Sequence, residues 1–258
     1  MEKMPYPIEP GTVKQQGAVV NSFERDYSEL VDLAVHDLDA PLRKLTVLVD
    51  MLTGKLAGDT ETVSYVQRIA GCIGNMRSLI DDLAVLAKMS VQENDFVLCN
   101  IEEVIQQALQ DLPEAIKDRK AVVTLRSLPS FEADGQLMRL LFKHLIENAI
   151  KFNKSNEPPR ISIQSSAIAA KDKKDFGLNG DKQYYKLEVI DNGIGFKNQY
   201  ADKIFQPFVR LHGKAHYSGN GIGLAICRKI VELHRGTIYA ESRENEESRF
   251  IIILPESH

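Results

Sequence analysis

Residues 187–196 read Leu-Glu-Val-Ile-Asp-Asn-Gly-Ile-Gly-Phe, an apolar run that ends in a carboxylate and two closely spaced glycines. The apolar run predicts a buried strand, and Asp191 follows at the end of that strand. Glycine permits positive φ and a close approach of the backbone to a ligand, while a buried aspartate accepts a hydrogen bond from an amino group. The stretch therefore predicts a ligand site that contains Asp191, Gly193 and Gly195. Asn192-Gly193 is also a typical β-hairpin turn, and this alternative stays open.

The chain around this stretch alternates short helices and strands. Apolar periodicity predicts helices over 101–112, 135–152 and 222–234. Strands are expected at 121–126, 161–167, 184–190, 237–241 and 250–254. Helices and strands that share one sheet predict a two-layer α+β sandwich, and we assign it to residues 96–256.

Asn148 and Lys151 lie three residues apart on the helix predicted over 135–152, so they project from nearly the same face. An amide oxygen is a suitable ligand for Mg²⁺, and lysine supplies a compact positive charge for phosphate. Without other motifs, an ordinary polar helix face explains the pair equally well.

Gly219, Gly221 and Gly223 lie at the start of the helix predicted over 222–234. The N-terminal N–H groups and the dipole of a helix favour phosphate at such a position. The spacing also resembles a dinucleotide-binding fingerprint. That fingerprint needs an early strand–turn–helix unit, whereas this motif comes late in the chain.

The first third of the chain has a different pattern. Residues 1–20 lack the basic start and apolar stretch of a secretory signal, and we expect a flexible lead-in there. Apolar residues then recur at steps of three, four and seven over 21–56 and again over 60–87, which predicts two long amphipathic helices joined by a short turn. A hairpin of this kind covers its apolar stripe poorly, so residues 21–92 are expected to dimerise into a four-helix bundle.

Length and composition favour two domains and exclude some classes of function. The 258 residues are enough for one or two domains, and the change of pattern after residue 92 favours two. No apolar run reaches the roughly 18 residues that would suggest a membrane span. The net charge of -4, with both signs interspersed, gives no indication of a nucleic-acid partner. Cys72, Cys99 and Cys227 are odd in number and form no CxxC pair, which argues against a disulfide framework and a zinc site.

His36 faces outward from the apolar stripe of the first predicted helix, with Asp37 directly after it and Pro41 five residues on. Pro41 should bend the helix locally. An exposed imidazole is nucleophilic when one ring nitrogen is unprotonated, and an adjacent carboxylate can fix its tautomer or accept its proton. His36 is therefore a candidate nucleophile and Asp37 its base, although an isolated pair of this kind is more often an ordinary surface feature.

The segments His36–Leu42, Asn148–Phe152, Asp191–Gly195 and Gly219–Gly223 together resemble the motifs of the sensor histidine kinases of two-component systems. The resemblance covers nearly all of the chain from residue 25 onward. It implies a dimerising phosphotransfer domain followed by an ATP-binding domain of the Bergerat (GHKL) type. It also implies autophosphorylation of His36 from Mg-ATP and transfer to an aspartate of a response-regulator receiver domain.

The same resemblance implies roles for individual residues. Asn148 would hold Mg²⁺, Lys151 would meet phosphate, and Phe152 would lie near the nucleotide. Asp191 would recognise adenine, and the distal glycines would admit the phosphate tail. Two positions of the His36–Leu42 motif depart from the family pattern. Asp39 stands where Arg is common. Ala40 stands where many members carry the Thr or Asn associated with dephosphorylation of the partner, which puts that reverse activity in doubt.

Residues 204–211 resemble the family's F box, which begins a lid over the nucleotide. Phe205 is the candidate nucleotide contact in this segment, and its aromatic ring would alternatively anchor the loop. Arg210 and Lys214 are candidates to neutralise phosphate charge when the lid closes.

Position 144 separates the kinases from other relatives of the same fold. Gyrase, the Hsp90 chaperones and the MutL proteins carry a glutamate one helical turn before the metal-binding Asn, whereas this chain has His144. Glu147 points about 100° away around the helix from Asn148 and is expected to be a poor substitute. Phosphoryl transfer is thus favoured over the first alternative, an ATP-hydrolysing machine. The second alternative is a catalytically degenerate dimeric scaffold, and the intact His36, Asn148, Asp191 and distal glycines argue against it. His144 replaces an Asn of the kinases and is either a further metal candidate or a packing residue.

The expected partners are a second copy of the chain, a receiver domain and a sensor or input protein. The sequence contains no recognisable sensor domain, so input comes through a partner or through further parts of a longer protein. The expected location is the cytoplasm, with the soluble part of a longer or membrane-associated sensor as the alternative.

Overall fold

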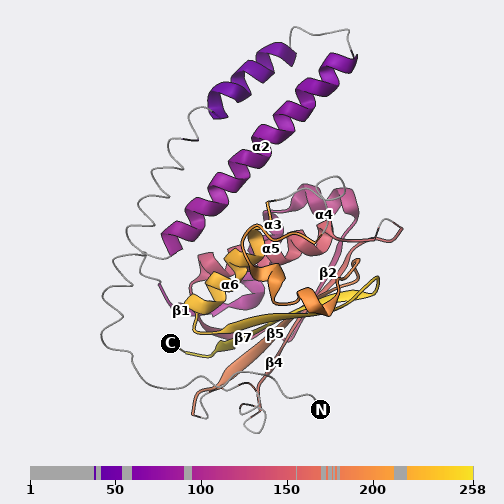
Figure 1. The fold of residues 1–258 in the computed structure, drawn as a ribbon. Coiled ribbons are helices and arrows are strands. Elements are labelled where there is room, and N and C mark those ends of the chain that lie inside the picture. The colour runs from indigo at the N-terminus through magenta and orange to yellow at the C-terminus, as the bar shows by residue number, and fades with distance from the viewer. Residues whose placement is uncertain are drawn as a thin grey trace.

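The computed structural model describes residues 38, 42–53, 60–89, 95–154, 156–169, 173, 176, 178, 181–211 and 220–257. Several predicted features lie outside the described residues: the lead-in 1–20, His36, Asp37, Asp39, Ala40, Lys214 and Gly219. Within the described ranges, a pair of helices is followed by an α+β domain (Figure 1).

The first part is a pair of packed helices. Residues 42–53 are helical, and α2 spans Thr60–Met89. One apolar cluster joins the two helices and consists of Leu42, Val49, Val66, Ile73 and Ile80. Its members recur every seven residues on each helix, which is the spacing of a coiled-coil seam. The described part of the chain thus confirms a hairpin-like pair of helices. No helix within these ranges is both long and apolar enough to cross a membrane.

The second part is a two-layer α+β sandwich, as predicted. Its helices are α3 (Ile101–Gln110), α4 (Pro113–Arg119), α5 (Gly135–Lys151) and α6 (Gly223–Leu233). Its main sheet consists of β2 (Val122–Arg126), β4 (Arg160–Ala167), β5 (Tyr184–Asp191), β6 (Thr237–Arg243) and β7 (Glu247–Pro255). The strand order is β2-β4-β5-β7-β6, with β2 parallel to β4 and the other pairs antiparallel. Figure 1 shows α3, α5 and α6 on one face of this sheet.

Short elements complete the domain. β1 (Val97–Asn100) pairs with β3 (Ser130–Ala133) in a separate two-stranded sheet, and two 3-10 turns, η1 (Asn198–Tyr200) and η2 (Lys203–Phe205), follow β5. Neither β1, β3 nor α4 was predicted. Strands β1 and β3 have four residues each, which are too few to display the alternation of a strand. Helix α4 has only seven residues, begins with Pro113 and ends before Lys120, whose backbone is left-handed.

Helix α5 is fixed at both its start and its apolar face. The Asp134 side chain caps it by accepting hydrogen bonds from the N–H groups of Gln136 and Leu137. The N–H of Asp134 donates to Nε2 of the fully buried His234 at 3.0 Å, which ties the end of α6 to the start of α5. The buried residues of α5 are Met138, Leu141, Phe142, Leu145, Ile146, Ala149 and Ile150. The opposite face of the helix therefore holds its polar residues in a fixed position.

The end of α2 packs on the α+β domain. Leu79, Leu83 and Leu86 contact the core of that domain, and Met89 is buried within it. Ile80, on the neighbouring face of the same helix, belongs to the apolar cluster between the two N-terminal helices. Helix α2 therefore connects the two cores.

Candidate functional site

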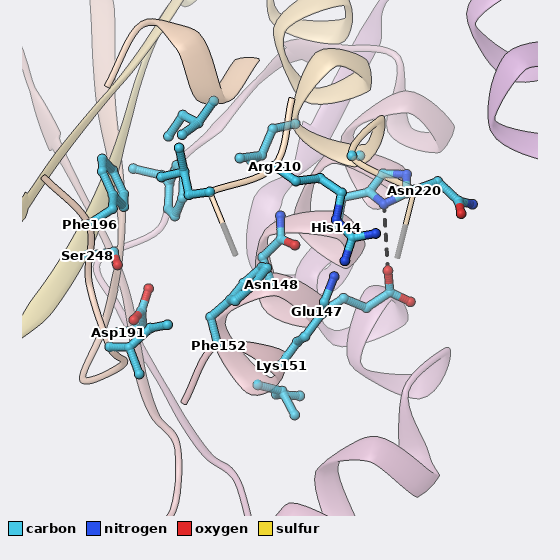
Figure 2. A pocket seen from close by; sticks show the side chains of 18 of the residues that line it. His144, Glu147, Asn148, Lys151, Phe152, Asp191, Phe196, Arg210, Asn220 and Ser248 are labelled. Atoms are coloured by element: carbon cyan, nitrogen blue, oxygen red, sulfur yellow. Dashed lines mark ion pairs between the residues drawn. The ribbon is translucent and has the colours of Figure 1, made fainter. Parts of the chain in front are cut away.

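A cavity of about 570 Å³ opens beside α5 and receives most of the residues singled out in the sequence. Its lining includes nine of them: His144, Asn148, Lys151, Phe152, Asp191, Gly195, Arg210, Gly221 and Gly223. Figure 2 shows Asp191 on one side of this cavity and His144, Glu147 and Asn220 on the other. These residues come from α5, the end of β5, the segment after η2 and the start of α6, which the fold brings together.

Asp191 ends β5 and is 5% exposed. Its Oδ1 accepts a hydrogen bond from the N–H of Gly193 at 2.8 Å, and Ser248, its partner in the register with β7, also donates to the carboxylate. Burial raises the pKa of Asp191 to about 6, against the hydrogen bonds of Gly193 and Ser248, which favour the ionised form. Phe196 and Phe250 line the same cavity. A buried acceptor in a cavity that aromatic side chains also line suits a planar ring that carries an amino group.

The two glycines after Asp191 are required by close contacts. A Cβ at Gly193 would lie 2.6 Å from Asp191 Oδ1 and from the carbonyl oxygen of Phe152. Gly195 has a φ of +60°, and a Cβ there would collide with the carbonyl oxygen of Arg243. No strand follows this segment to form a hairpin, because β5 pairs with β4 and β7. The hairpin interpretation of Asn192-Gly193 is therefore wrong.

Lys151 and Arg210 bring two positive charges to the cavity (Figure 2). Burial lowers the pKa of Lys151, and the positive charge of Arg210 lowers it further. Lys151 Nζ also lies 4.6 Å from the centre of the Phe152 ring. Two cations held near one another in a partly buried site favour a polyanion such as a phosphate chain.

Helix α6 presents its N-terminus at the same cavity. Its N-cap residue Ile222 makes no side-chain capping bond, and Gly221 before it has a φ of +75°. The first N–H groups of a helix lack intrahelical partners, so an anion is well placed there. Gly223 and Gly221 thus lie where the sequence predicted phosphate binding.

His144 and Glu147 interact with each other on the far side of the cavity from Asp191. His144 Nδ1 lies 3.6 Å from Glu147 Oε2, as the dashed line in Figure 2 marks. The other ring nitrogen of His144 is buried and has no hydrogen-bond partner among the described residues. Glu147 lines the cavity as well, although its position on the helix lies about 100° around from Asn148. Its carboxylate instead faces an imidazole one turn earlier.

The donors in this cavity fit a divalent cation that arrives with phosphates. Asn148 offers an amide oxygen, which suits Mg²⁺. The buried Nε2 of His144 has no hydrogen-bond partner among the described residues, but imidazole is a less typical ligand of this cation. No group of three or more His, Cys, Asp or Glu side chains suited to a metal occurs among the described residues. A cation held by one or two protein ligands, with phosphate oxygens and water completing its coordination, matches the habit of Mg²⁺.

Two predicted site residues play a different part. Phe205 is 2% exposed, packs edge-to-face on Phe250, and lies under the guanidinium of Arg228, so it anchors the loop and does not line the cavity. Gly193 donates a hydrogen bond to Asp191 through its backbone N–H and is likewise not among the residues that line the cavity.

The structure also adds residues that the sequence did not indicate. Ser248 reaches Asp191 only through strand pairing over more than fifty residues. Ser78 and Asp82 reach the cavity from α2, and the Asn220 side chain hydrogen-bonds Asp82. None of these long-range contacts leaves a periodic or motif signal in the sequence.

Part of the chain is similar to a known family of ATPases. Residues 133–258 match the family of histidine kinase-, DNA gyrase B-, and HSP90-like ATPases. Cyanobacterial phytochrome A from Nostoc sp. is 33% identical over 242 residues, which cover 92% of this chain and 30% of that protein. The chain thus spans about 30% of the length of the curated relatives it matches first. Most of the residues that line the cavity lie within the range that is similar to this family.

Solved structures agree on the fold. Full-length ShkA in complex with AMPPNP matches with a TM-score of 0.65 and 20% identity, over 88% of this chain and 45% of that chain. The catalytic domain of histidine kinase ThkA matches with a TM-score of 0.50 and 26% identity, over 63% of this chain and 97% of that domain. The first match extends beyond the ATP-binding domain into the N-terminal helices.

Proposed function

We propose that the chain is the catalytic region of a sensor histidine kinase, with a dimerising phosphotransfer hairpin at 21–92 and an ATP-binding domain at 96–256. It transfers the γ-phosphoryl group of ATP to His36 and then to an aspartate of a response-regulator receiver domain. The observation that carries the proposal is one cavity that combines a buried carboxylate, a pair of cations and the open N-terminus of α6. The named histidine kinase relative and the ATPase family match support the same reading.

The adenine, the phosphates and the accompanying metal ion each have a counterpart in the cavity. Asp191 accepts a hydrogen bond from the adenine amino group. Lys151, Arg210 and the backbone at Gly221 and Gly223 hold the phosphates. Mg²⁺, when bound with ATP, neutralises phosphate charge, and Asn148 and His144 are the residues that would hold it.

The transfer step needs a nucleophile from the hairpin. A ring nitrogen of His36 forms a bond to the γ-phosphorus while the bond from that phosphorus to the bridging oxygen breaks, and ADP leaves with the electron pair. The proton on the other imidazole nitrogen passes to Asp37. The sequence order His36-Asp37 and the position of the pair on the predicted helix support these roles.

Exposed apolar residues on the helix pair support dimerisation. Ile69 and Met76 of α2 are 49% and 43% exposed, and Leu45 and Leu52 of the first helix are 43% and 48% exposed. Each pair is spaced by seven residues, so it forms a second seam beside the one buried within the hairpin. A second copy of the hairpin would cover this seam and produce the four-helix bundle.

The partners follow from the same chemistry. A phosphorylated imidazole needs an acceptor carboxylate, which a receiver domain provides. Signal input comes through a sensor region or an input protein, and the cytoplasm, where ATP is available and cysteines stay reduced, is the proposed location.

Glu147 gives a second candidate function, an ATP-hydrolysing machine, because its carboxylate lines the cavity and could activate water. One experiment separates the two. The protein is incubated with γ-labelled ATP and Mg²⁺, and the label on the protein is tested for acid lability and base stability. We expect acid-labile, base-stable label that is lost in His36→Gln. Free phosphate without phosphoprotein would support hydrolysis, and neither product would leave a catalytically inactive dimeric scaffold.

A further inference from the structure

We infer that Asp82, a carboxylate of the helical hairpin, makes nucleotide binding depend on the divalent cation. The inference rests on the proposed function of the cavity. Asp82 belongs to α2, yet it lines the same cavity as His144, Asn148 and Lys151 of the ATP-binding domain. The hairpin therefore contributes a negative charge to a site built for phosphates.

The packing of α2 holds this carboxylate in place. Leu79, Leu83 and Leu86, on the turns around Asp82, contact the core of the ATP-binding domain. The side-chain amide of Asn220 donates a hydrogen bond to Asp82. Asn220 directly precedes Gly221, where the chain turns into α6. Asp82 is thus fixed both by its own helix and by the segment that forms the phosphate end of the cavity.

The surroundings of Asp82 place it at the end of the cavity far from the adenine subsite. Its electrostatic neighbours are His144, Glu147 and the adjacent Asp81, and Figure 2 shows the first two beside Asn220, opposite Asp191. Burial raises the pKa of Asp82, and the nearby His144 and the Asn220 hydrogen bond favour its ionised form. Two carboxylates, Asp82 and Glu147, therefore lie where the phosphate chain would end.

A carboxylate at this position acts in opposite directions on the two forms of the nucleotide. It repels metal-free phosphates, and it attracts a cation that is bound to them. At an effective dielectric constant of about 20, two unit charges about 8 Å apart interact strongly enough to change an affinity by about tenfold or more. Asp82 consequently selects the metal complex of ATP against free ATP. The side chain need not touch the cation for this effect.

The test measures binding and not turnover. The affinity of the full chain for AMPPNP is measured by isothermal titration calorimetry with Mg²⁺ and again with a chelator, and the ratio of the two affinities is compared between variants. We expect this ratio to fall by about tenfold or more in Asp82→Asn. It should stay unchanged in Asp82→Glu and in the matched control Asp81→Asn, because Asp81 is the exposed neighbour on the same helix.

A second variant works in the opposite direction. Ser78→Asp adds a carboxylate on the turn before Asp82, at another position that lines the cavity, and should increase the ratio. An unchanged ratio in both Asp82→Asn and Ser78→Asp would overturn the inference, as would an equal change in Asp81→Asn. If the unmodified chain binds no nucleotide even with Mg²⁺, the proposed function itself fails.

Discussion

Replacing Asp191 with asparagine should weaken ATP binding and, at the same time, stabilise the nucleotide-free protein. The N–H of Gly193 donates to Asp191 Oδ1 at 2.8 Å, and an asparagine carbonyl oxygen can keep that bond. Its NH₂ group would then face the adenine amino group, so two donors would meet. Loss of a hydrogen bond to a charged acceptor costs about 1.5–3 kcal/mol, which corresponds to about 10- to 150-fold in affinity.

The effect on stability has the opposite sign. Burial raises the pKa of Asp191 from its ordinary value of 3.8 to about 6, so the folded protein binds more protons than the unfolded chain between these two pH values. The free energy of unfolding therefore falls as the pH rises through this window, and above pH 6 the buried charge costs up to about 3 kcal/mol. Asparagine is neutral at every pH and removes this cost. Burial of its amide, and the loss of any Ser248 hydrogen bond to the oxygen that its NH₂ group replaces, offset part of the gain.

Two measurements at pH 8 check this prediction. Calorimetric titration gives the affinity for Mg-ATP, and thermal unfolding gives the stability of the nucleotide-free protein. Asp202→Asn makes the same substitution at an exposed position outside the cavity and should change neither quantity. Unchanged ATP affinity in Asp191→Asn would refute the adenine role, and lower stability of that variant would refute the cost assigned to the buried charge.

Two further predictions concern the hairpin and the core. The double substitution Ile69→Glu and Met76→Glu places charges on the exposed seam of α2, so sedimentation should report a monomer. The control Gln67→Glu, at an exposed position of α2 outside both seams, should remain a dimer, and a dimeric double variant would contradict the bundle. His234 accepts a hydrogen bond from the Asp134 N–H, and burial lowers the pKa of its imidazole. Its contribution to the free energy of unfolding is therefore fully present above the ordinary pKa of 6.5 and is lost as the pH falls below that value. In urea unfolding at pH 8, His234→Ala should be less stable than the unmodified chain by at least about 1–3 kcal/mol, with the difference shrinking at pH 5.5; a difference that grows on acidification would contradict a neutral buried imidazole.

The larger elements were predictable because their periodicity is long enough to be read. Helix α2 repeats its apolar residues over eight turns, and β5 is apolar up to the point where Asp191 ends it. The glycines near Asp191 were recognised as a ligand loop, although an Asn-Gly dipeptide is locally compatible with a hairpin. Only the pairing of β5 with β4 and β7, which is not encoded locally, decides between the two.

The parts that were missed depend on contacts between distant segments. Ser248 meets Asp191 through strand register, and Asp82 meets Asn220 because α2 packs on the domain. Phe205 was a candidate nucleotide contact, but its ring packs against the ring of Phe250 and the guanidinium of Arg228. Glu147 was expected to point about 100° around α5 from Asn148, yet both residues line the cavity, because a flexible side chain can turn toward it.

The shared helix α2 has a thermodynamic consequence. Ile80 belongs to the apolar cluster of the hairpin, and Leu79 and Leu83 belong to the core of the ATP-binding domain, so neighbouring residues of one rigid element join two cores. Melting of the hairpin would strip apolar contacts from the ATP-binding domain as well, and the two parts should unfold as a single cooperative unit. Because the two parts unfold together, nucleotide binding at the cavity should also slow hydrogen exchange of the backbone amides at the start of α2, which lie away from the ligand. Nucleotide bound at the cavity thereby increases the stability of the N-terminal helices.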